Sequence, residues 1–249
     1  MVRALVLAAG MGLVPKLPVP PPLPATLITS DGVTLAADAY RSSSATAPVI
    51  LLFHQAGSGK SEYAPIAPRL VTLGYNALAI DQRSGGNLFS PPNATVQRLG
   101  RSAPYLDVLR DMEAALAWAR HTYPSAPVYA WGSSYSASLV FALAARHPHE
   151  IAAVIAFSPG EYFDDKRFVR DAARNVRVPI FVDSASDPAE ERQAREIVDA
   201  AASTLKERFV PHIGIHGAST LRDDRDAGGA SENWDAVTAF LARVGAAHR

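Results

Sequence analysis

A serine lies in the middle of a short turn that connects an apolar run to a helix-forming run. The sequence Gly-Ser-Ser-Tyr-Ser at positions 132–136 follows the apolar residues 128–131 and leads directly into residues 137–146, which favour a helix. This order predicts a strand, a sharp turn and a helix. A serine at the centre of such a turn stands at the end of a strand, next to a helix N-terminus where negative charge is favoured. We therefore predict that Ser134 is a nucleophile.

The tightness of the turn selects among the three serines. The residues two before and two after the nucleophile come close together, so both must be small. Ser134 has Gly132 and Ser136 at these positions, whereas Ser133 would have two aromatic residues there. Ser136 is sterically acceptable, but it lies further from the strand and has no neighbouring glycine, so Ser134 is preferred. A serine-rich turn that only caps a helix is the alternative.

A serine hydroxyl needs a neighbouring base, usually an imidazole that a carboxylate orients. Among the seven histidines, His216 follows the last predicted strand and precedes Gly217, which lets the loop turn back over the sheet. The other histidines lie at helix ends, in the C-terminal tail, inside a strand or in a different loop. We predict that His216 is the base, and a surface-loop histidine is the alternative.

The carboxylate is expected after the strand at residues 178–182. Asp187 lies in the loop that follows, directly before Pro188, whereas Asp183 is nearer to the strand and can point sideways. Asp187 is preferred as the acid. An aspartate before a proline is also a helix start signal, and the two roles are compatible.

Composition limits the classes of function. Of the 249 residues, 48% are hydrophobic, which is enough for a sizeable core. The 24 basic and 24 acidic residues give no net charge that would attract nucleic acid or an anionic membrane. The absence of cysteine excludes disulfides, thiolate metal sites and a cysteine nucleophile.

The first 25 residues differ from the rest of the chain. A basic start precedes an apolar run at 4–14, which is too short to span a bilayer and has the size of a signal-peptide core. The proline-rich segment at 15–25 is expected to be extended and polyproline-like. An export signal and a disordered cytoplasmic tail both remain open. In either case we expect the fold to occupy residues 26–249, without an integral membrane span.

Strands alternate with helices along the remaining chain, after an opening hairpin around Asp31 and Gly32. This alternation predicts a mostly parallel sheet with helices on both faces, and functional groups at the carboxyl ends of its strands. We expect strands at residues 26–30, 33–40, 48–53, 76–80, 128–131, 151–157, 178–182 and 208–215, and helices at 61–73, 105–121, 137–146, 164–174, 189–204 and 232–244.

The chain order Ser134, Asp187, His216 and the serine turn after a central strand resemble the α/β-hydrolases, from about residue 26 to the C-terminus. Within that superfamily the chain is similar to compact esterases of the dienelactone-hydrolase kind. The resemblance implies an α/β-hydrolase fold with a mostly parallel eight-stranded sheet, an N-terminal antiparallel hairpin, helices on both faces and a small or absent lid.

In this family the loop after the third strand supplies an oxyanion donor, often from a His-Gly-x-Gly stretch. Here the loop reads His-Gln-Ala-Gly at positions 54–57. The resemblance places the two donors at the backbone N–H groups of Ala56 and Tyr135. Gln55 replaces the usual glycine, so its own N–H or its side-chain amide is a further candidate. His54 is a candidate for the substrate pocket.

Two nearby motifs have structural interpretations. The sequence at 57–61, Gly-Ser-Gly-Lys-Ser, is similar to a phosphate-binding loop, but the first glycine of that motif is replaced by His54, so we do not predict nucleotide binding. Asp81 and Arg83 match the family's Asp-x-Arg-Gly turn, which the resemblance assigns to the scaffold.

The resemblance implies acyl transfer in two halves, through an acylated Ser134, with no metal or cofactor. The connection at 85–104 is the expected pocket wall, with Phe89, Arg98 and Arg101 as candidates. The two arginines would bind a substrate carboxylate, or they form a solvated basic loop.

The expected substrate is a small-molecule carboxylic ester with a small or exposed acyl group. Only about twenty residues separate the strands at 151–157 and 178–182, which leaves room for one helix as a lid. A peptidase, thioesterase or lactonase with the same three residues remains an alternative, as does a non-catalytic binding protein on the same fold. The sequence does not give the acyl preference or the oligomeric state.

Overall fold

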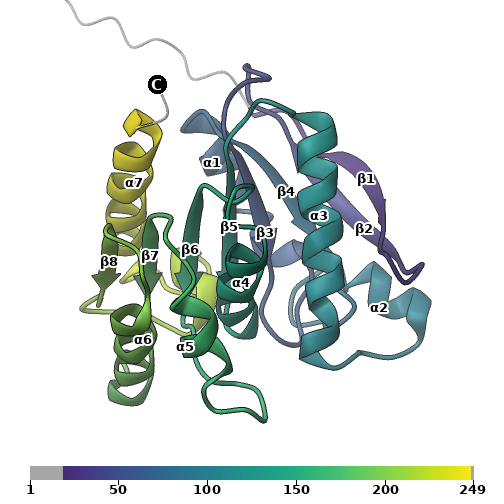
Figure 1. Cartoon of the computed structure of the whole chain (residues 1–249). Coiled ribbons are helices and arrows are strands. Elements are labelled where there is room, and N and C mark those ends of the chain that lie inside the picture. Colours follow the sequence, from purple (N-terminus) through teal and green to yellow (C-terminus); the bar gives the residue numbers. More distant parts are fainter. Residues whose placement is uncertain (1–18, 248–249) are drawn as a thin grey trace, which may run out of the picture.

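The computed structural model describes residues 19–247, which form one eight-stranded sheet with helices on both faces (Figure 1). The strand order is β1-β2-β4-β3-β5-β6-β7-β8. Strands β1 and β2 are antiparallel to each other, β2 is antiparallel to β4, and all further pairs are parallel. The strands are β1 (Leu23–Ile28), β2 (Thr34–Tyr40), β3 (Val49–Phe53), β4 (Asn76–Ile80), β5 (Val128–Ser133), β6 (Ala153–Phe157), β7 (Ile180–Asp183) and β8 (Lys206–Phe209).

The helices enclose the sheet as two layers. Helices α3, α4, α5 and α6 cover one face, and α1 and α7 cover the other (Figure 1). The α-helices are α1 (Ala67–Thr72), α2 (Ala94–Leu99), α3 (Leu109–Thr122), α4 (Tyr135–Arg146), α5 (Phe168–Ala173), α6 (Pro188–Ala200) and α7 (Ala230–Ala247), and the 3₁₀ helices are η1 (Lys60–Tyr63), η2 (Tyr105–Val108) and η3 (Gly217–Leu221). None of the helices in residues 19–247 has the length and apolar character that a membrane span requires.

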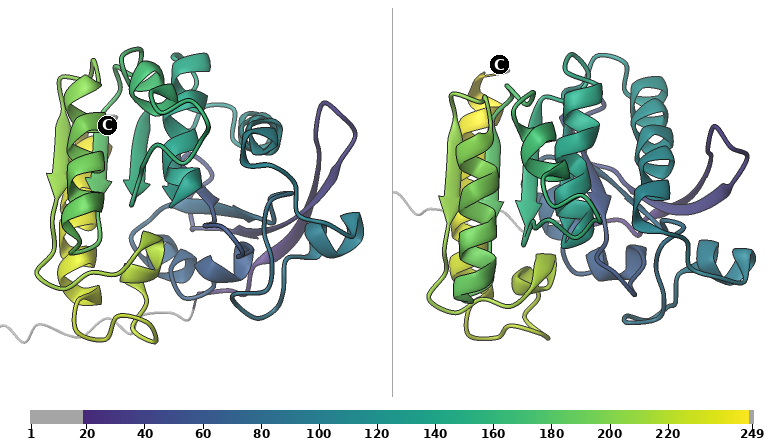
Figure 2. Two further views of the ribbon diagram at one scale, coloured as in Figure 1. Left: turned by 90° about the horizontal axis from the view of Figure 1, so that it is seen from below. Right: turned by 60° about the horizontal axis from the view of Figure 1, so that its bottom comes forward.

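The central strands are apolar along their whole length because both of their faces are covered. Every residue of β3, β4, β5 and β6 is buried. Side chains from alternate positions enter two separate cores, one under α3–α6 and one under α1 and α7. This packing fixes the carboxyl ends of the strands, around which α2 and the segment containing η3 are arranged (Figure 2). The expected α/β-hydrolase fold is confirmed.

The fold begins earlier than predicted. The proline-rich segment was expected to lie outside the fold up to residue 25, but β1 starts at Leu23 and includes Pro24, which pairs with Asp38 of β2. Because β1 is an edge strand, Pro24 removes no hydrogen bond from the interior of the sheet. The apolar run at 4–14 lies outside the described residues.

Prolines and caps explain the main differences from the predicted elements. The helix expected at 61–73 is divided into η1 and α1, with Pro65 between them and Pro68 in the first turn of α1. The connection at 85–104 contains α2, which the sequence analysis did not predict. Asn93 caps α2 by accepting the N–H of Val96, and Gly100 ends it in the left-handed conformation.

Candidate active site

Ser134 occupies a strained turn at the end of β5. Its φ of 59° and ψ of −125° are unusual for a residue with a side chain. The Ser134 N–H donates to the carbonyl oxygen of Phe157 at 2.8 Å, which ties the turn to β6. A Cβ atom on Gly132 would lie 2.4 Å from backbone atoms of Ser136, so this position accepts only glycine without rearrangement. The predicted small residues on both sides of Ser134 therefore have a direct steric cause.

A continuous chain of hydrogen bonds runs from Ser134 through His216 to Glu190. The Nε2 atom of His216 lies 2.8 Å from the Ser134 hydroxyl oxygen, and Nδ1 lies 2.6 Å from Oε1 of Glu190. Because the carboxylate can only accept, Nδ1 carries the proton and Nε2 accepts from the serine hydroxyl. His216 directly precedes η3, and Gly217 adopts a φ of +75° that turns the loop.

The structure places Asp187 differently from the prediction. Asp187 caps α6: its Oδ1 accepts the N–H groups of Ala189 and Glu190, at 2.9 and 3.0 Å, and it makes no hydrogen bond to His216. The helix that Asp187 begins carries Glu190 in its first turn, and this longer side chain reaches the imidazole. The expectation that Asp187 contacts His216 is wrong, and Glu190 takes that place.

Asp183 does not serve as the carboxylate partner of His216 either. It is 1% exposed at the end of β7, where burial and the negative charges of Asp226 and Glu232 raise its pKa well above the usual value. Its Oδ2 atom has no hydrogen-bond partner within the described residues. A buried carboxyl group of this kind is favoured in the neutral form.

Glu190 is held in the ionised form. Burial alone would raise its pKa, but the hydrogen bond from His216 and the electrostatic interaction with that ring outweigh burial and leave the pKa below its usual value. The N–H of Ala185 donates to its other oxygen, Oε2, at 3.3 Å. Both carboxylate oxygens are thus engaged, which fixes the orientation of the side chain.

Ser158 connects the surroundings of Glu190 and His216, and it was not among the residues predicted from the sequence. It follows β6 with a φ of 55°, and its hydroxyl oxygen accepts the N–H of Gly217 at 2.9 Å. A hydrogen-bonding interaction with Ser158 also helps to lower the pKa of Glu190. A polar residue directly after the buried run at 153–157 was the available signal.

Tyr162 lies against the same imidazole. Its ring stands edge-on to that of His216, with centroids 6.4 Å apart and planes at 84°. Its hydroxyl donates to the carbonyl oxygen of Ser158 at 2.8 Å. Burial raises the pKa of Tyr162, so the hydroxyl remains a donor. Tyr162 belongs to the short connection between β6 and β7, and it packs against one edge of the His216 ring.

The two predicted oxyanion donors, on the loop after β3 and at the start of α4, can be compared with Gln55. The N–H of Gln55 donates to Oε2 of Glu62 at 2.8 Å, and its side-chain amide donates to the hydroxyl of Ser219 at 3.0 Å. Neither group of Gln55 is therefore free for a ligand. The N–H groups of Ala56 and Tyr135 have no acceptor within residues 19–247.

His54 is fully buried and contacts only protein groups. Its Nδ1 bonds the carbonyl oxygen of Gln55 at 2.8 Å, while Nε2 faces the N–H of Gln82 at 3.1 Å and the amide of Asn93 at 3.2 Å. Burial lowers the pKa of His54 to about 4. The neutral ring orients the loop rather than lining a substrate pocket, contrary to its predicted position.

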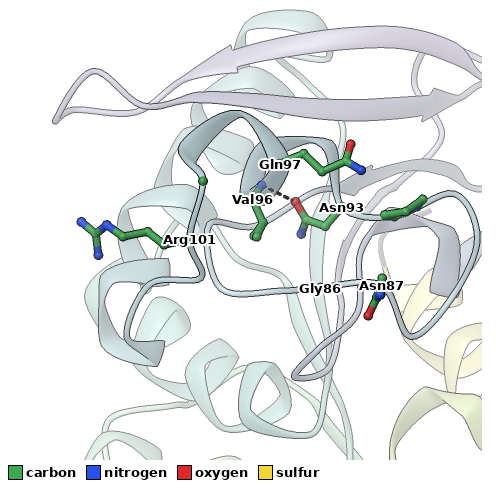
Figure 3. Close-up of a pocket in the computed structure, with 8 residues that line it drawn as sticks. Gly86, Asn87, Asn93, Val96, Gln97 and Arg101 are labelled. Atoms are coloured by element: carbon green, nitrogen blue, oxygen red, sulfur yellow. Dashed lines mark hydrogen bonds between the residues drawn. The ribbon is translucent and has the colours of Figure 1, made fainter.

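The three predicted pocket residues on the connection at 85–104, Phe89, Arg98 and Arg101, have different surroundings in the structure. A cavity of about 370 Å³ lies along this connection, and Arg101 is one of its lining residues (Figure 3). Phe89 is buried, with the guanidinium group of Arg222 4.2 Å from its ring centre, and Arg98 donates to the carbonyl oxygen of Thr34. The lining residues of the cavity include neither Ser134 nor His216, so the cavity is separate from the candidate site at Ser134.

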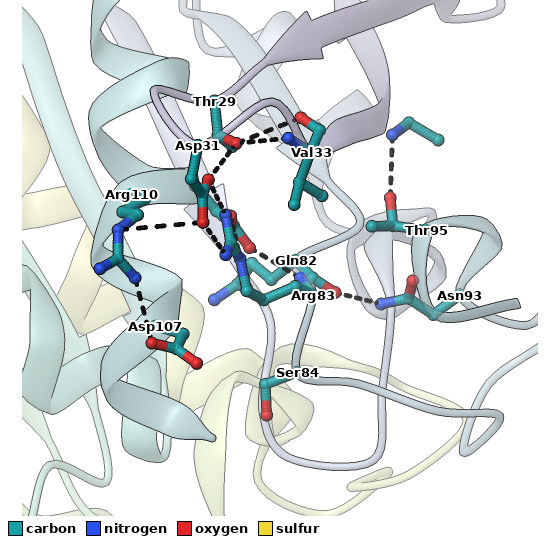
Figure 4. Close-up of polar contacts among 12 residues, drawn as sticks. Thr29, Asp31, Val33, Gln82, Arg83, Ser84, Asn93, Thr95, Asp107 and Arg110 are labelled. Carbon is teal, nitrogen blue, oxygen red and sulfur yellow. Dashed lines mark hydrogen bonds and ion pairs between the residues drawn. The ribbon is translucent and has the colours of Figure 1, made fainter. Parts of the chain in front are cut away.

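Arg83 is buried and belongs to a network of ion pairs that extends to the surface (Figure 4). It bonds Asp111 at 2.7 Å and Asp31 at 2.6 Å. Burial raises the pKa of Asp111 to about 6 despite this contact, whereas the hydrogen bond from Arg83 holds the pKa of Asp31 below its usual range. Asp81 accepts the N–H groups of Lys60 and Ala94. Both motif residues thus make contacts typical of a structural turn.

Comparisons with known proteins agree with this architecture. The sequence matches the family described as serine aminopeptidase, S33, over residues 44–175, and no curated protein matches it significantly. An esterase of Pyrococcus furiosus is 20% identical, with a TM-score of 0.65 over 89% of this chain and 92% of that chain. A dienelactone hydrolase of Anabaena variabilis is 14% identical, with a TM-score of 0.69 over 89% and 98% of the two chains. A carboxyl esterase of Bacillus coagulans is 12% identical, with a TM-score of 0.69 over 90% and 99%. At these identities the solved structures establish the fold.

Proposed function

Because the chain belongs to the serine aminopeptidase (S33) family of hydrolases, we propose that it is a serine hydrolase that cleaves carboxylic esters through an acyl-enzyme. The observation that supports this proposal most strongly is the unbroken series of hydrogen bonds from Glu190 through His216 to Ser134. In this proposal Ser134 is the nucleophile, His216 is the general base and Glu190 is the acid that orients the base.

In the first half of the reaction, the Ser134 oxygen bonds the ester carbonyl carbon while its proton moves to Nε2 of His216. The carbonyl oxygen becomes an oxyanion, which the N–H groups of Ala56 and Tyr135 stabilise. Each such donor contributes on the order of 3 kcal/mol in comparable sites. The intermediate then collapses, the alcohol leaves with the proton from Nε2, and the acyl group remains on the serine.

In the second half, water attacks the acyl-enzyme and His216 takes its proton. Collapse of the second oxyanion releases the carboxylic acid and returns the proton to Ser134. Glu190 stays ionised throughout, and its charge stabilises the imidazolium ring that forms in each half. The depressed pKa of Glu190 fits this task.

The short connection between β6 and β7 favours small or exposed acyl groups. Only α5, a helix of 6 residues, interrupts this connection, and the side chain of His216 is 40% exposed. With so short a connection and a partly exposed base, substrate can approach without the opening of a large lid. We therefore expect short-chain esters to be better substrates than long-chain lipids.

A labelling experiment and a substrate panel test the proposal. A fluorophosphonate probe should label the wild type covalently and should leave Ser134→Ala unlabelled. p-Nitrophenyl esters of increasing chain length should be hydrolysed with a preference for short acyl chains. Absence of labelling and of ester hydrolysis in the wild type, or equal labelling of the Ser134→Ala variant, would overturn the proposal.

A peptidase is the second candidate, because the matched family is described as a serine aminopeptidase. The same panel should include aminoacyl amides and thioesters. Faster cleavage of the amides than of the esters would assign the peptidase reaction to the same three side chains.

A further inference from the structure

A second carboxyl group, Glu62, bonds the loop after β3 and takes no chemical step in the proposed reaction. Glu62 belongs to η1 and is fully buried. Its Oε2 atom accepts the N–H of Gln55 at 2.8 Å, and its Oε1 atom has no partner within the described residues. A buried carboxyl group without full compensation is costly for folding.

Glu62 binds Gln55, the residue directly before Ala56, and the Ala56 N–H is a proposed oxyanion donor. The carbonyl oxygen of Gln55 is bound by His54, and its N–H is bound by Glu62. These two contacts fix the peptide groups on both sides of the Gln55 Cα atom. In a trans peptide the carbonyl and the following N–H point in opposite directions, so the direction of the Ala56 N–H is fixed as well.

The same residue links the loop to the segment that carries His216. The Gln55 amide donates to the Ser219 hydroxyl at 3.0 Å, and the N–H of Ala218 donates to the Ser133 hydroxyl at 2.8 Å. A Cβ atom on Gly217 would lie 2.5 Å from the Ser133 oxygen and 3.2 Å from Gln55 Oε1. The loop after β3, the end of β5 and the histidine loop are therefore hydrogen-bonded to one another and closely packed at Gly217.

We propose that Glu62 is a positioning residue, which holds the Gln55 peptide so that the adjacent Ala56 N–H points at the developing oxyanion. This inference rests on the proposed function. Glu62 acts through Gln55 and touches no reacting atom. Its contribution should appear in the transition state, where the oxyanion exists, rather than in binding of the planar ester.

Two substitutions of similar size separate positioning from bulk packing. Glu62→Gln keeps an acceptor oxygen for the Gln55 N–H, whereas Glu62→Met fills the same space without one. We expect Glu62→Gln to retain kcat within about threefold of the wild-type value. Glu62→Met should lose about tenfold to a hundredfold in kcat with little change in KM, because small misplacements of catalytic groups cause losses of this size. Circular dichroism and thermal melting should show that both variants are folded.

A transition-state analogue provides a measurement that a merely structural role would not change. A trifluoromethyl ketone forms a tetrahedral adduct with an oxyanion, so its inhibition constant should rise in Glu62→Met by the same factor by which kcat/KM falls. If Glu62→Met does not fold, Glu62→Asp gives the second test, because its shorter side chain withdraws the acceptor from Gln55. The same parallel loss is expected there.

The possible outcomes distinguish this inference from the proposed function. A wild type without ester hydrolysis or labelling would remove the proposed function and this inference with it. An active wild type with equally active Glu62→Met, or a Glu62→Gln variant as impaired as Glu62→Met, would overturn the role of Glu62 alone. Unchanged affinity for the ketone in an impaired variant would also overturn it.

Discussion

Glu190 reaches the imidazole of His216 from the first turn of α6, at 2.6 Å. The aspartate that begins the same helix points back at backbone N–H groups instead. A glutamate on a helix is a more rigid support than a loop residue, because its backbone is fixed by the hydrogen bonds of the helix. The position of the acid thus depends on where α6 begins.

Substitutions at the two acidic positions should affect different properties, kcat for Glu190 and stability for Asp187. Glu190→Gln should lower kcat by roughly a thousandfold or more, since an amide cannot hold the required tautomer or stabilise the imidazolium ring. Asp187→Ala should leave kcat of the folded protein close to the wild-type value and should lower the free energy of unfolding by about 1 kcal/mol through loss of the cap. Steady-state kinetics and chemical denaturation of both variants measure the two effects. A large loss of kcat in Asp187→Ala with full activity in Glu190→Gln would reverse the assignment.

Ser158 should affect activity and stability by different mechanisms. Ser158→Ala removes the acceptor for the Gly217 N–H and should lower kcat several-fold by loosening the histidine loop. Ser158→Gly removes the same hydroxyl but relieves the strain of a side chain at a φ of 55°. The glycine variant should therefore be about 1 kcal/mol more stable than the alanine variant while having similarly reduced activity. Thermal melting and kcat of the pair test this, and an alanine variant with wild-type kcat would contradict it.

His54 should make stability depend on pH. Its pKa falls from 6.5 to about 4 because the ring is buried. Between these values the unfolded chain binds a proton that the folded protein does not, so the free energy of unfolding falls as the pH falls. The contribution is complete above about pH 6.5, and about 3 kcal/mol is lost by about pH 4.

Chemical denaturation between pH 7 and pH 4 measures this contribution as a difference between proteins. His54→Asn should show a weaker dependence on pH than the wild type, whereas His121→Asn, at the exposed end of α3, should keep the wild-type dependence. An identical slope for His54→Asn and the wild type would show that another group is responsible.

The buried ion pair between Arg83 and Asp111 should be strongly coupled. Arg83→Met leaves a buried carboxylate without its cation and should lower the free energy of unfolding by about 3–5 kcal/mol. Adding Asp111→Asn removes the unpaired charge, so the double variant should recover part of this loss. A double-mutant cycle by chemical denaturation measures the coupling, and strictly additive losses would contradict it.

Much of the fold could be predicted because its causes are local. The fully apolar runs that became β3 and β6 and the glycine at the turn after Asp31 are signals of nearby structure. The boundaries were less predictable where signals compete. Pro24 is compatible with both a polyproline segment and an edge strand, and only the pairing with β2 decides between them.

The candidate site was predictable only in part. Ser134 could be identified because its turn has a steric requirement within five residues of sequence, and the hydrogen bond to His216 follows from the topology of the sheet. Glu190 could not be identified, because the choice between it and Asp187 depends on the side chain that reaches the ring after α6 has packed. Glu62 could not be identified either, since its contact with Gln55 joins two segments whose packing the sequence does not specify.

The two outermost strands of the sheet have a consequence for self-association. Pro24 interrupts the row of donors along β1, and β8 consists of four residues, three of them charged. Edges of this kind are poor templates for a further strand, because an incoming chain would meet a missing N–H on one side and a short, mostly charged strand on the other. Pairing of two copies edge to edge, the first step toward a cross-β fibre, is therefore disfavoured at both margins of the folded protein.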